Sequence, residues 1–212
     1  MLIEYIPTFN YFSAFVTPTS TSKVLDFGSN CGNYLKSSPI SLDYTGIDVD
    51  QGAIEEGQRL YSDSTWIWYN RYNPAYNSTG ERVLPTIDKT FDLIISYSVF
   101  THMTIEDSEE LLDYLYSILE PGGKLCFSFC DIDNRVCVEW FRARRIDCDP
   151  VDTNNFVYLV NNRVSQVEPA EPCIHFVAFY KRAWLLERLK RFNPVAHNVP
   201  AGWLQDCILI VK

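Results

Sequence analysis

A glycine-containing turn between a predicted strand and a predicted helix constrains the fold of this chain more than any other stretch. Residues 23–35 read K-V-L-D-F-G-S-N-C-G-N-Y-L, so an apolar run ends at Asp26 and is followed by Gly28 and Gly32. Glycine lets the backbone take positive φ angles and approach a ligand closely, and the free N–H groups at a helix start bind anionic groups. The stretch therefore predicts a strand, a ligand-binding turn and a helix.

A second acidic residue follows at the spacing of a β-α-β unit. Residues 44–50, Y-T-G-I-D-V-D, read as a strand, and Asp48 lies 20 residues beyond Gly28. At this distance the second parallel strand delivers a carboxylate to the ribose hydroxyls of a nucleoside ligand. We therefore predict that Asp48 binds a ribose.

A dinucleotide-dependent dehydrogenase is the rival interpretation of this turn. Its G-x-G-x-x-G fingerprint requires three glycines, whereas the corresponding residues here are Gly28, Asn30 and Asn33. The carboxylate of Asp26 would also repel a pyrophosphate, although it suits a ligand that carries an ammonium group or hydroxyls. The sequence disfavours a dinucleotide.

The remaining chain alternates between strand and helix patterns. Strands are predicted at residues 64–69, 91–98 and 124–129, helices at 5–16, 51–61, 105–119 and 176–192, and a closing hairpin at 194–198 with 207–211. Alternation of this kind predicts one α/β domain over residues 1–212. Its sheet is expected to be Rossmann-like, mostly parallel and seven-stranded, with an antiparallel C-terminal strand and helices on both faces.

The alternation stops between residues 130 and 172. Residues 156–167 read as a hairpin around an Asn161–Asn162 turn. An insertion at the C-terminal end of a strand in such a sheet commonly determines substrate specificity. The alternative is that this insertion only extends the edge of the sheet and binds no substrate. The candidate substrate contacts in this insertion are Glu139, Trp140 and Tyr158.

Composition limits the partners and the compartment. A net charge of −9 argues against binding nucleic acid by general phosphate neutralisation. Seven cysteines without a C-x-x-C pair suit a reduced cytosol better than a disulfide framework or a zinc ribbon. There is no signal-like start and no apolar run of about 18 residues. We therefore expect a cytoplasmic protein that binds no membrane and no metal, and the sequence leaves its oligomeric state open.

Four motifs in this order resemble those of the class I S-adenosylmethionine-dependent methyltransferases. They read V-L-D-F-G-S-N-C-G-N-Y-L, Y-T-G-I-D-V-D, F-D-L-I-I-S-Y-S-V-F-T-H-M and L-Y-S-I-L-E-P-G-G-K-L, and Gln205-Asp206 is similar to the terminal Q-D of small bacterial members. The resemblance covers residues 23–129 well. It implies that the cofactor is S-adenosyl-L-methionine.

The resemblance also implies which residues hold this cofactor. Asp26, Gly28 and Gly32 would surround its methionine moiety, Asp48 its ribose, and Asn70 would lie near its adenine. The other implied cofactor contacts are Ser29, Asn30, Val49 and Ser96. Asn30 departs from the family, which has glycine there; asparagine is among the residues most tolerant of positive φ, so we expect the turn to survive.

Methyl transfer from a sulfonium is an in-line displacement, to which positioning contributes at best about 7–11 kcal/mol. His102 follows the predicted strand 91–98 and is the candidate general base for a hydroxyl acceptor, because imidazole titrates near neutral pH. The alternative is that His102 only orders its loop. Tyr97 and Thr101 are candidate acceptor contacts.

The expected reaction is methyl transfer to an O or N atom of a small-molecule acceptor. One alternative is a non-catalytic relative that binds the cofactor or a partner protein. Asn30 supports this alternative because it stands where the family has glycine. The other is a methyltransferase that acts on a macromolecule. The net charge disfavours it, as do residues 96–99, S-Y-S-V, where amino-directed nucleic-acid enzymes carry N-P-P-Y.

Overall fold

The computed structural model of the chain describes residues 8–73, 76–103, 105–137, 139, 149–150, 156–163, 173–197 and 204–212, with the backbone alone for 149–150, 156–163 and 173–177. Its helices are α1 (Thr8–Ser13), α2 (Asn33–Ser37), α3 (Gln51–Leu60), α4 (Ile105–Ser117) and α6 (Arg182–Arg188), with 3-10 turns η1 (Phe100–His102) and η2 (Lys190–Phe192). Its strands are β1 (Lys23–Phe27), β2 (Asp43–Asp48), β3 (Thr65–Trp68), β4 (Phe91–Ser96), β5 (Leu119–Asp131), β6 (Asp149–Pro150), β7 (Phe156–Arg163), β8 (Cys173–Tyr180), β9 (Val195–His197) and β10 (Asp206–Val211).

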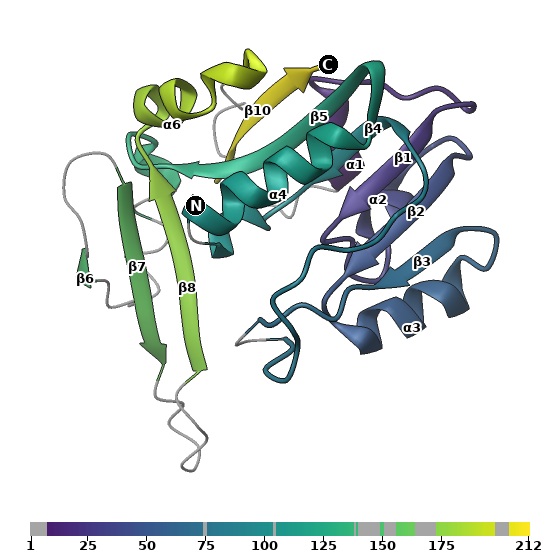
Figure 1. Cartoon of the computed structure of the whole chain (residues 1–212), viewed down its shortest axis with the longest axis horizontal. Coiled ribbons are helices and arrows are strands. Elements are labelled where there is room, and N and C mark those ends of the chain that lie inside the picture. The colour runs from purple at the N-terminus through teal and green to yellow at the C-terminus, as the bar shows by residue number, and fades with distance from the viewer. Residues whose placement is uncertain are drawn as a thin grey trace.

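The strands form one mixed sheet that branches at β5 (Figure 1). Strands β3, β2, β1, β4 and β5 lie in this order and are parallel. The middle of β5 pairs with β10, which runs antiparallel to both β5 and β9. The end of β5, at Cys130 and Asp131, pairs instead with β8. The mostly parallel sheet with an antiparallel C-terminal strand is therefore confirmed, and β6, β7 and β8 extend it.

Helices cover both faces of the sheet, as predicted. Neighbouring residues of β1 point to opposite faces because side chains alternate along a strand. Val24 packs in a core that includes buried residues of α1, α2 and α3, whereas Leu25 packs in a core with α4 and α6. In Figure 1, α4 crosses in front of the sheet. The carboxyl ends of the parallel strands remain open between these layers.

Two predictions in the second half of the chain are wrong. Residues 176–180, predicted as the start of a helix, belong to strand β8, and the helix begins at Arg182. Asn161–Asn162 does not turn, because β7 runs straight through it and pairs antiparallel with β8 from Phe156 to Arg163. Short apolar runs rich in aromatic residues suit either type of element, and here strand pairing decides. The β7–β8 ribbon extends away from the rest of the sheet (Figure 1).

An ion-pair cluster joins α6 to the ends of β5 and β10. The Arg182 guanidinium donates to Asp131 at 2.9 Å and to Asp206 at 2.8 Å, and both acids are 3% exposed. Buried charges need such partners, because leaving water is costly for them. The cluster fixes the start of β10 beside the carboxyl end of β5.

Candidate functional site

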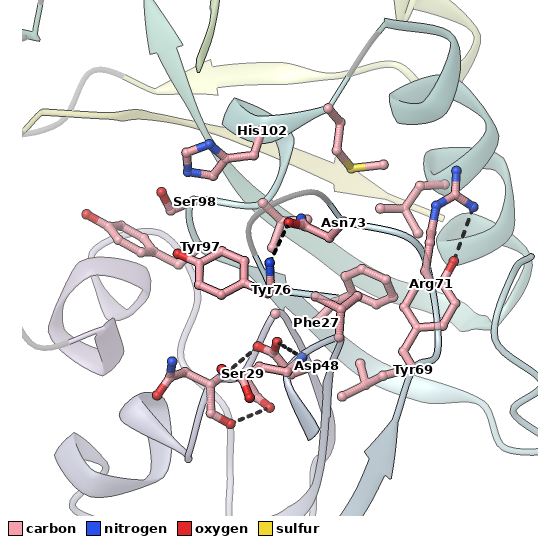
Figure 2. Close-up of a pocket in the computed structure, with 18 of the residues that line it drawn as sticks. Phe27, Ser29, Asp48, Tyr69, Arg71, Asn73, Tyr76, Tyr97, Ser98 and His102 are labelled. Carbon is pink, nitrogen blue, oxygen red and sulfur yellow. Dashed lines mark hydrogen bonds between the residues drawn. The ribbon is translucent and has the colours of Figure 1, made fainter. Parts of the chain in front are cut away.

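A cavity of about 620 Å³ opens at the carboxyl ends of β1, β2 and β4. Its walls come from the turn after β1, the end of β2, the loops after β3 and β4, and the first turns of α4; Figure 2 draws most of these side chains. Ligands of open α/β sheets bind at this edge, where strand ends and loops converge. Its volume lies within the range of small-molecule sites, about 300–1,000 Å³.

The turn after β1 keeps its glycine-like shape despite Asn30. The φ angles are 81° at Gly28, 49° at Asn30 and 94° at Gly32. Asparagine tolerates this left-handed conformation because its side chain can hydrogen-bond locally. Here the amide oxygen of Asn30 accepts from the N–H of Cys31 at 2.8 Å. The expectation that Asn30 preserves the turn is confirmed.

Asp48 ends β2 at the floor of the cavity. Its Oδ2 accepts from the N–H of Asn30 at 2.7 Å and its Oδ1 from the N–H of Asp50 at 2.9 Å. Burial raises the pKa of this carboxyl, and hydrogen bonds from the backbone N–H groups of Asp50, Asn30 and Val49 oppose the rise. Each carboxylate oxygen can accept a second hydrogen bond, so Asp48 can still bind hydroxyl groups from the cavity.

Asp26 is the most buried acid in the cavity wall among the described residues, at 2% exposed. Burial raises the pKa of its carboxyl to about 7, against the 2.7 Å hydrogen bond that the hydroxyl of Tyr44 donates to it, and the charge of Asp48 adds to the rise. A cation in the cavity would favour the ionised form. The site therefore suits an ammonium or a sulfonium.

The loop after β4 forms the wall opposite Ser29 and Asp48, with Tyr97, Ser98 and His102 on one side of the cavity (Figure 2). His102 is exposed and lies in η1, where its N–H donates to the Val99 carbonyl at 2.9 Å. This loop packs directly on the glycine turn.

Two close contacts fix this loop. A Cβ atom at Gly28 would lie 2.2 Å from Cγ2 of Val99, so glycine is required where the loop crosses the turn. The ring of Tyr97 meets that of Tyr11 in α1 edge-on, with 5.0 Å between the ring centroids. The first helix thus supports the cavity wall from behind.

The loop after β3 supplies wall residues that we did not predict individually. The set comprises Tyr69, Arg71, Tyr72, Asn73, Tyr76 and Arg82. Arg71 ties this loop to α4 through a 2.7 Å ion pair with Asp107, and its side chain is 12% exposed. Several tyrosines in a polar loop were the available signal for such a wall.

Several predicted site residues lie away from the cavity wall. Ser96 and Thr101 are buried, Gly32 lies against Trp66 and Tyr61, and the amide oxygen of Asn70 accepts from Asn77 at 3.0 Å. Those in the wall are Asp26, Gly28, Ser29, Asn30, Asp48, Val49, Tyr97 and His102.

The structure does not test the substrate contacts that we predicted in the insertion. Glu139 is exposed, Trp140 lies outside the described residues, and only the backbone of Tyr158, in β7, is described. Their roles stay predictions. Among the described residues we find no cluster of three metal-binding side chains and no helix long and apolar enough to span a membrane.

Comparisons with known proteins give one family match and several similar folds. Residues 25–125 match the family model of a methyltransferase domain. The fold is similar to that of an S-adenosylmethionine-dependent methyltransferase from Clostridium acetobutylicum ATCC 824, with a TM-score of 0.59 and 13% identity over 91% of this chain and 84% of that one.

Two further solved structures share the fold. The glycopeptide N-methyltransferase MtfA, complexed with S-adenosyl-L-methionine, has a TM-score of 0.59 and 14% identity over 97% of this chain and 92% of its own. Magnesium protoporphyrin IX methyltransferase (ChlM) from Synechocystis PCC 6803, with bound SAH, has a TM-score of 0.56 and 12% identity over 91% and 74%. At these identities the likeness concerns the fold.

Proposed function

Since residues 25–125 match the family model of a methyltransferase domain and the fold is similar to that of S-adenosylmethionine-dependent methyltransferases, we propose that the chain transfers the methyl group of S-adenosyl-L-methionine to an O or N atom of a small-molecule acceptor. One observation carries the proposal. A single cavity joins the left-handed turn, the acids at the ends of β1 and β2, and the loop that bears His102.

The residues of the turn and of β2 fit the cofactor. Asp48 would hold the ribose hydroxyls with the acceptor sites that its bonds to backbone N–H groups leave open. Asp26, whose pKa lies near neutrality, would take the carboxylate form beside the amino group of the methionine moiety. The positive φ of Asn30 weakens the case for a non-catalytic relative, which depended on that residue.

The loop after β4 would face the acceptor. Bound S-adenosyl-L-methionine supplies an electrophilic methyl group on a sulfonium. His102 would accept the proton of a hydroxyl acceptor, since its exposed imidazole stands in the cavity wall. Tyr97, held by the aromatic residues of α1, would exclude water from that side.

A small acceptor is favoured by the cavity itself. Its volume of about 620 Å³, which must also hold the cofactor, lies within the range of small-molecule sites. The net charge of −9 gives no electrostatic advantage to a nucleic acid. Reduced cytosol remains the expected compartment.

Calorimetric titration with S-adenosylmethionine and S-adenosylhomocysteine tests cofactor binding. The wild type should bind both. Asp48→Ala should weaken binding by about tenfold or more, because hydrogen bonds to a charged group contribute roughly 1.5–3 kcal/mol. The matched control is Asp63→Ala, which removes an exposed acid outside the cavity wall. A wild type that binds neither compound would refute the proposal, and unchanged binding by Asp48→Ala would refute the ribose assignment.

The role of His102 is tested by His102→Gln. This variant should keep its affinity for S-adenosylhomocysteine and lose turnover on a hydroxyl acceptor found by screening small alcohols, phenols and amines for S-adenosylhomocysteine release. Unchanged turnover would make His102 a structural residue of the loop.

A further inference from the structure

Three polar residues form a closed ring of hydrogen bonds behind the cavity wall. The N–H of Ser98 donates to Oγ of Ser128 at 2.7 Å, and this Oγ donates to Oε1 of Gln205 at 2.6 Å. Nε2 of Gln205 then donates to Oγ of Ser98 at 3.0 Å. Ser128 is fully buried and Gln205 is 8% exposed, whereas Ser98 lines the cavity. The ring therefore connects β5 and the start of β10 to the cavity.

The ring sets the direction of each proton. Oγ of Ser128 accepts from a backbone N–H, so its own hydrogen goes to the Gln205 oxygen, and this orients the Gln205 amide. The Gln205 amide then donates to Oγ of Ser98. The hydroxyl hydrogen of Ser98 is left for Oγ1 of Thr101, 3.3 Å away, or for a ligand in the cavity.

Ser98 also has an unusual backbone. Its φ is 61°, in the left-handed region that residues other than glycine seldom adopt. Such a conformation persists where the surroundings hold it, and here hydrogen bonds hold both its N–H and its Oγ. The chain then passes through Val99, which packs on Gly28, into the turn that ends at His102.

The first helix anchors the same ring from the other side. The hydroxyl of Tyr11 donates to the backbone carbonyl of Gln205 at 3.1 Å. The Tyr11 ring also packs edge-on against Tyr97, the neighbour of Ser98 in the cavity wall. Gln205 is thus held by its main chain as well as by its amide.

We propose that Gln205 is a positioning residue for methyl transfer: its amide holds Ser98 in the left-handed conformation, and so sets the direction of the Ser98 hydroxyl and the place of His102 in the cavity. This inference rests on the proposed function. Gln205 lies outside the cavity wall and acts through Ser98.

Nuclear magnetic resonance of the imidazoles tests the inference without any ligand. The chain has three histidines, and His102→Gln assigns the signal of His102 in protein labelled at histidine. Gln205→Leu should shift that signal and change the pH midpoint of its titration, because the loop relaxes when the ring opens. The matched control is Gln58→Leu, an exposed glutamine of α3, which should leave the signal in place. A purely stabilising role would lower the melting temperature without moving the signal.

Ser128→Ala opens the same ring from the buried side with a smaller change, and decides the question if Gln205→Leu does not fold. The inference is overturned if the folded variants show the wild-type signal and midpoint for His102. Titration of the wild type with S-adenosylhomocysteine tests the proposed function separately. A wild type that fails to bind it, while Gln205→Leu moves the His102 signal, would refute the function and leave the ring's control of His102 established.

Discussion

The backbone N–H of Asn30 donates a 2.7 Å hydrogen bond to Oδ2 of Asp48, 18 residues further along the chain. The residue at which this turn departs from the usual glycine therefore orients the acid that we assign to the ribose. The bond depends on the backbone of Asn30 rather than on its side chain. Whether a residue at position 30 is tolerated should therefore depend on the φ angle that it accepts.

Substitution of Asn30 should follow this rule. Asn30→Gly should keep both stability and affinity for S-adenosylhomocysteine, because glycine adopts a φ of 49° freely. Asn30→Val should lose about 1–2 kcal/mol of unfolding free energy, since a β-branched residue strains there, and should also weaken binding. Urea unfolding and calorimetry measure the two effects.

Asn193 provides the control for that experiment, because it is exposed, has a φ of 50° and lies outside the cavity wall. Asn193→Val should lose similar stability and keep full affinity. Equal losses of affinity in the two valine variants would contradict the assigned role of the turn.

Asp26 should make stability fall as the pH rises. Its pKa is raised from the usual 3.8 to about 7, so between these values the folded state binds more protons than the unfolded state. Protonated Asp26 therefore contributes its full share of the unfolding free energy below about pH 4. This contribution, a few kcal/mol in total, is lost as the pH rises through 7. Asp26→Asn keeps an acceptor for Tyr44 and does not titrate. The unfolding free energy of wild type minus that of Asp26→Asn should therefore decrease from about pH 4 to pH 7 and stay level above; a pH-independent difference would refute the raised pKa.

Gly28→Ala should lower the unfolding free energy by more than the strain of its positive φ angle alone. The new Cβ would lie 2.2 Å from Val99 in addition to adopting a φ of 81°. We expect a loss of about 2–4 kcal/mol from strain and overpacking together. Val99→Ala in the same chain should recover part of it, with a coupling of about 1 kcal/mol in a double-mutant cycle.

Gly122→Ala isolates the backbone effect, because Gly122 has a φ of 78° and nothing lies within 4 Å of an added Cβ. It should lose only about 1–2 kcal/mol. Equal urea midpoints for Gly28→Ala and Gly122→Ala would show that the contact between Gly28 and Val99 is not tight.

Arg182→Met should destabilise the protein strongly. It removes the guanidinium from two carboxylates whose side chains are 4% exposed, and a broken buried ion pair typically costs about 3–5 kcal/mol. Arg59→Met removes an exposed pair with Glu56 and should change the unfolding free energy by less than about 1 kcal/mol. Similar urea midpoints for the two variants would show that the cluster adds little stability.

The first half of the site could be predicted because its signals are local. Asp26, Gly28 and Asp48 lie within one β-α-β unit, where spacing along the chain determines position in space, whereas Gly32 of the same turn lies away from the cavity wall. Asn30 could be assessed as well, because its tolerance of positive φ is intrinsic to the residue.

The loop after β3 was harder to predict. Tyr72 and Tyr76 line the cavity in a loop that Arg71 joins to Asp107, 36 residues away, and sequence spacing does not predict such a contact. Asn70 seemed well placed for the adenine, yet its amide bonds to Asn77 within the same loop.

The strand β8 was mistaken for helix for a related reason. The run from Phe176 to Tyr180 is apolar throughout, so neither helical nor strand periodicity marks it. Its pairing with β7 is what makes it a strand, and that partner lies across residues 164–172, which are outside the described ranges. The sequence marked Gln205 only through its place in the Q-D motif. Its hydrogen bonds could not be predicted, because its partners Ser128 and Ser98 are 77 and 107 residues away.

The position of β10 has a consequence for synthesis of the protein. This strand pairs with the edge of β5 and brings Gln205 to Ser128, which precedes it by 77 residues. At about 5–20 residues per second, a ribosome needs roughly 4–15 seconds to add that length. For that time β5 of the nascent chain lacks its β10 partner along an apolar edge, and we therefore expect the new protein to depend on chaperones until β10 has been synthesised.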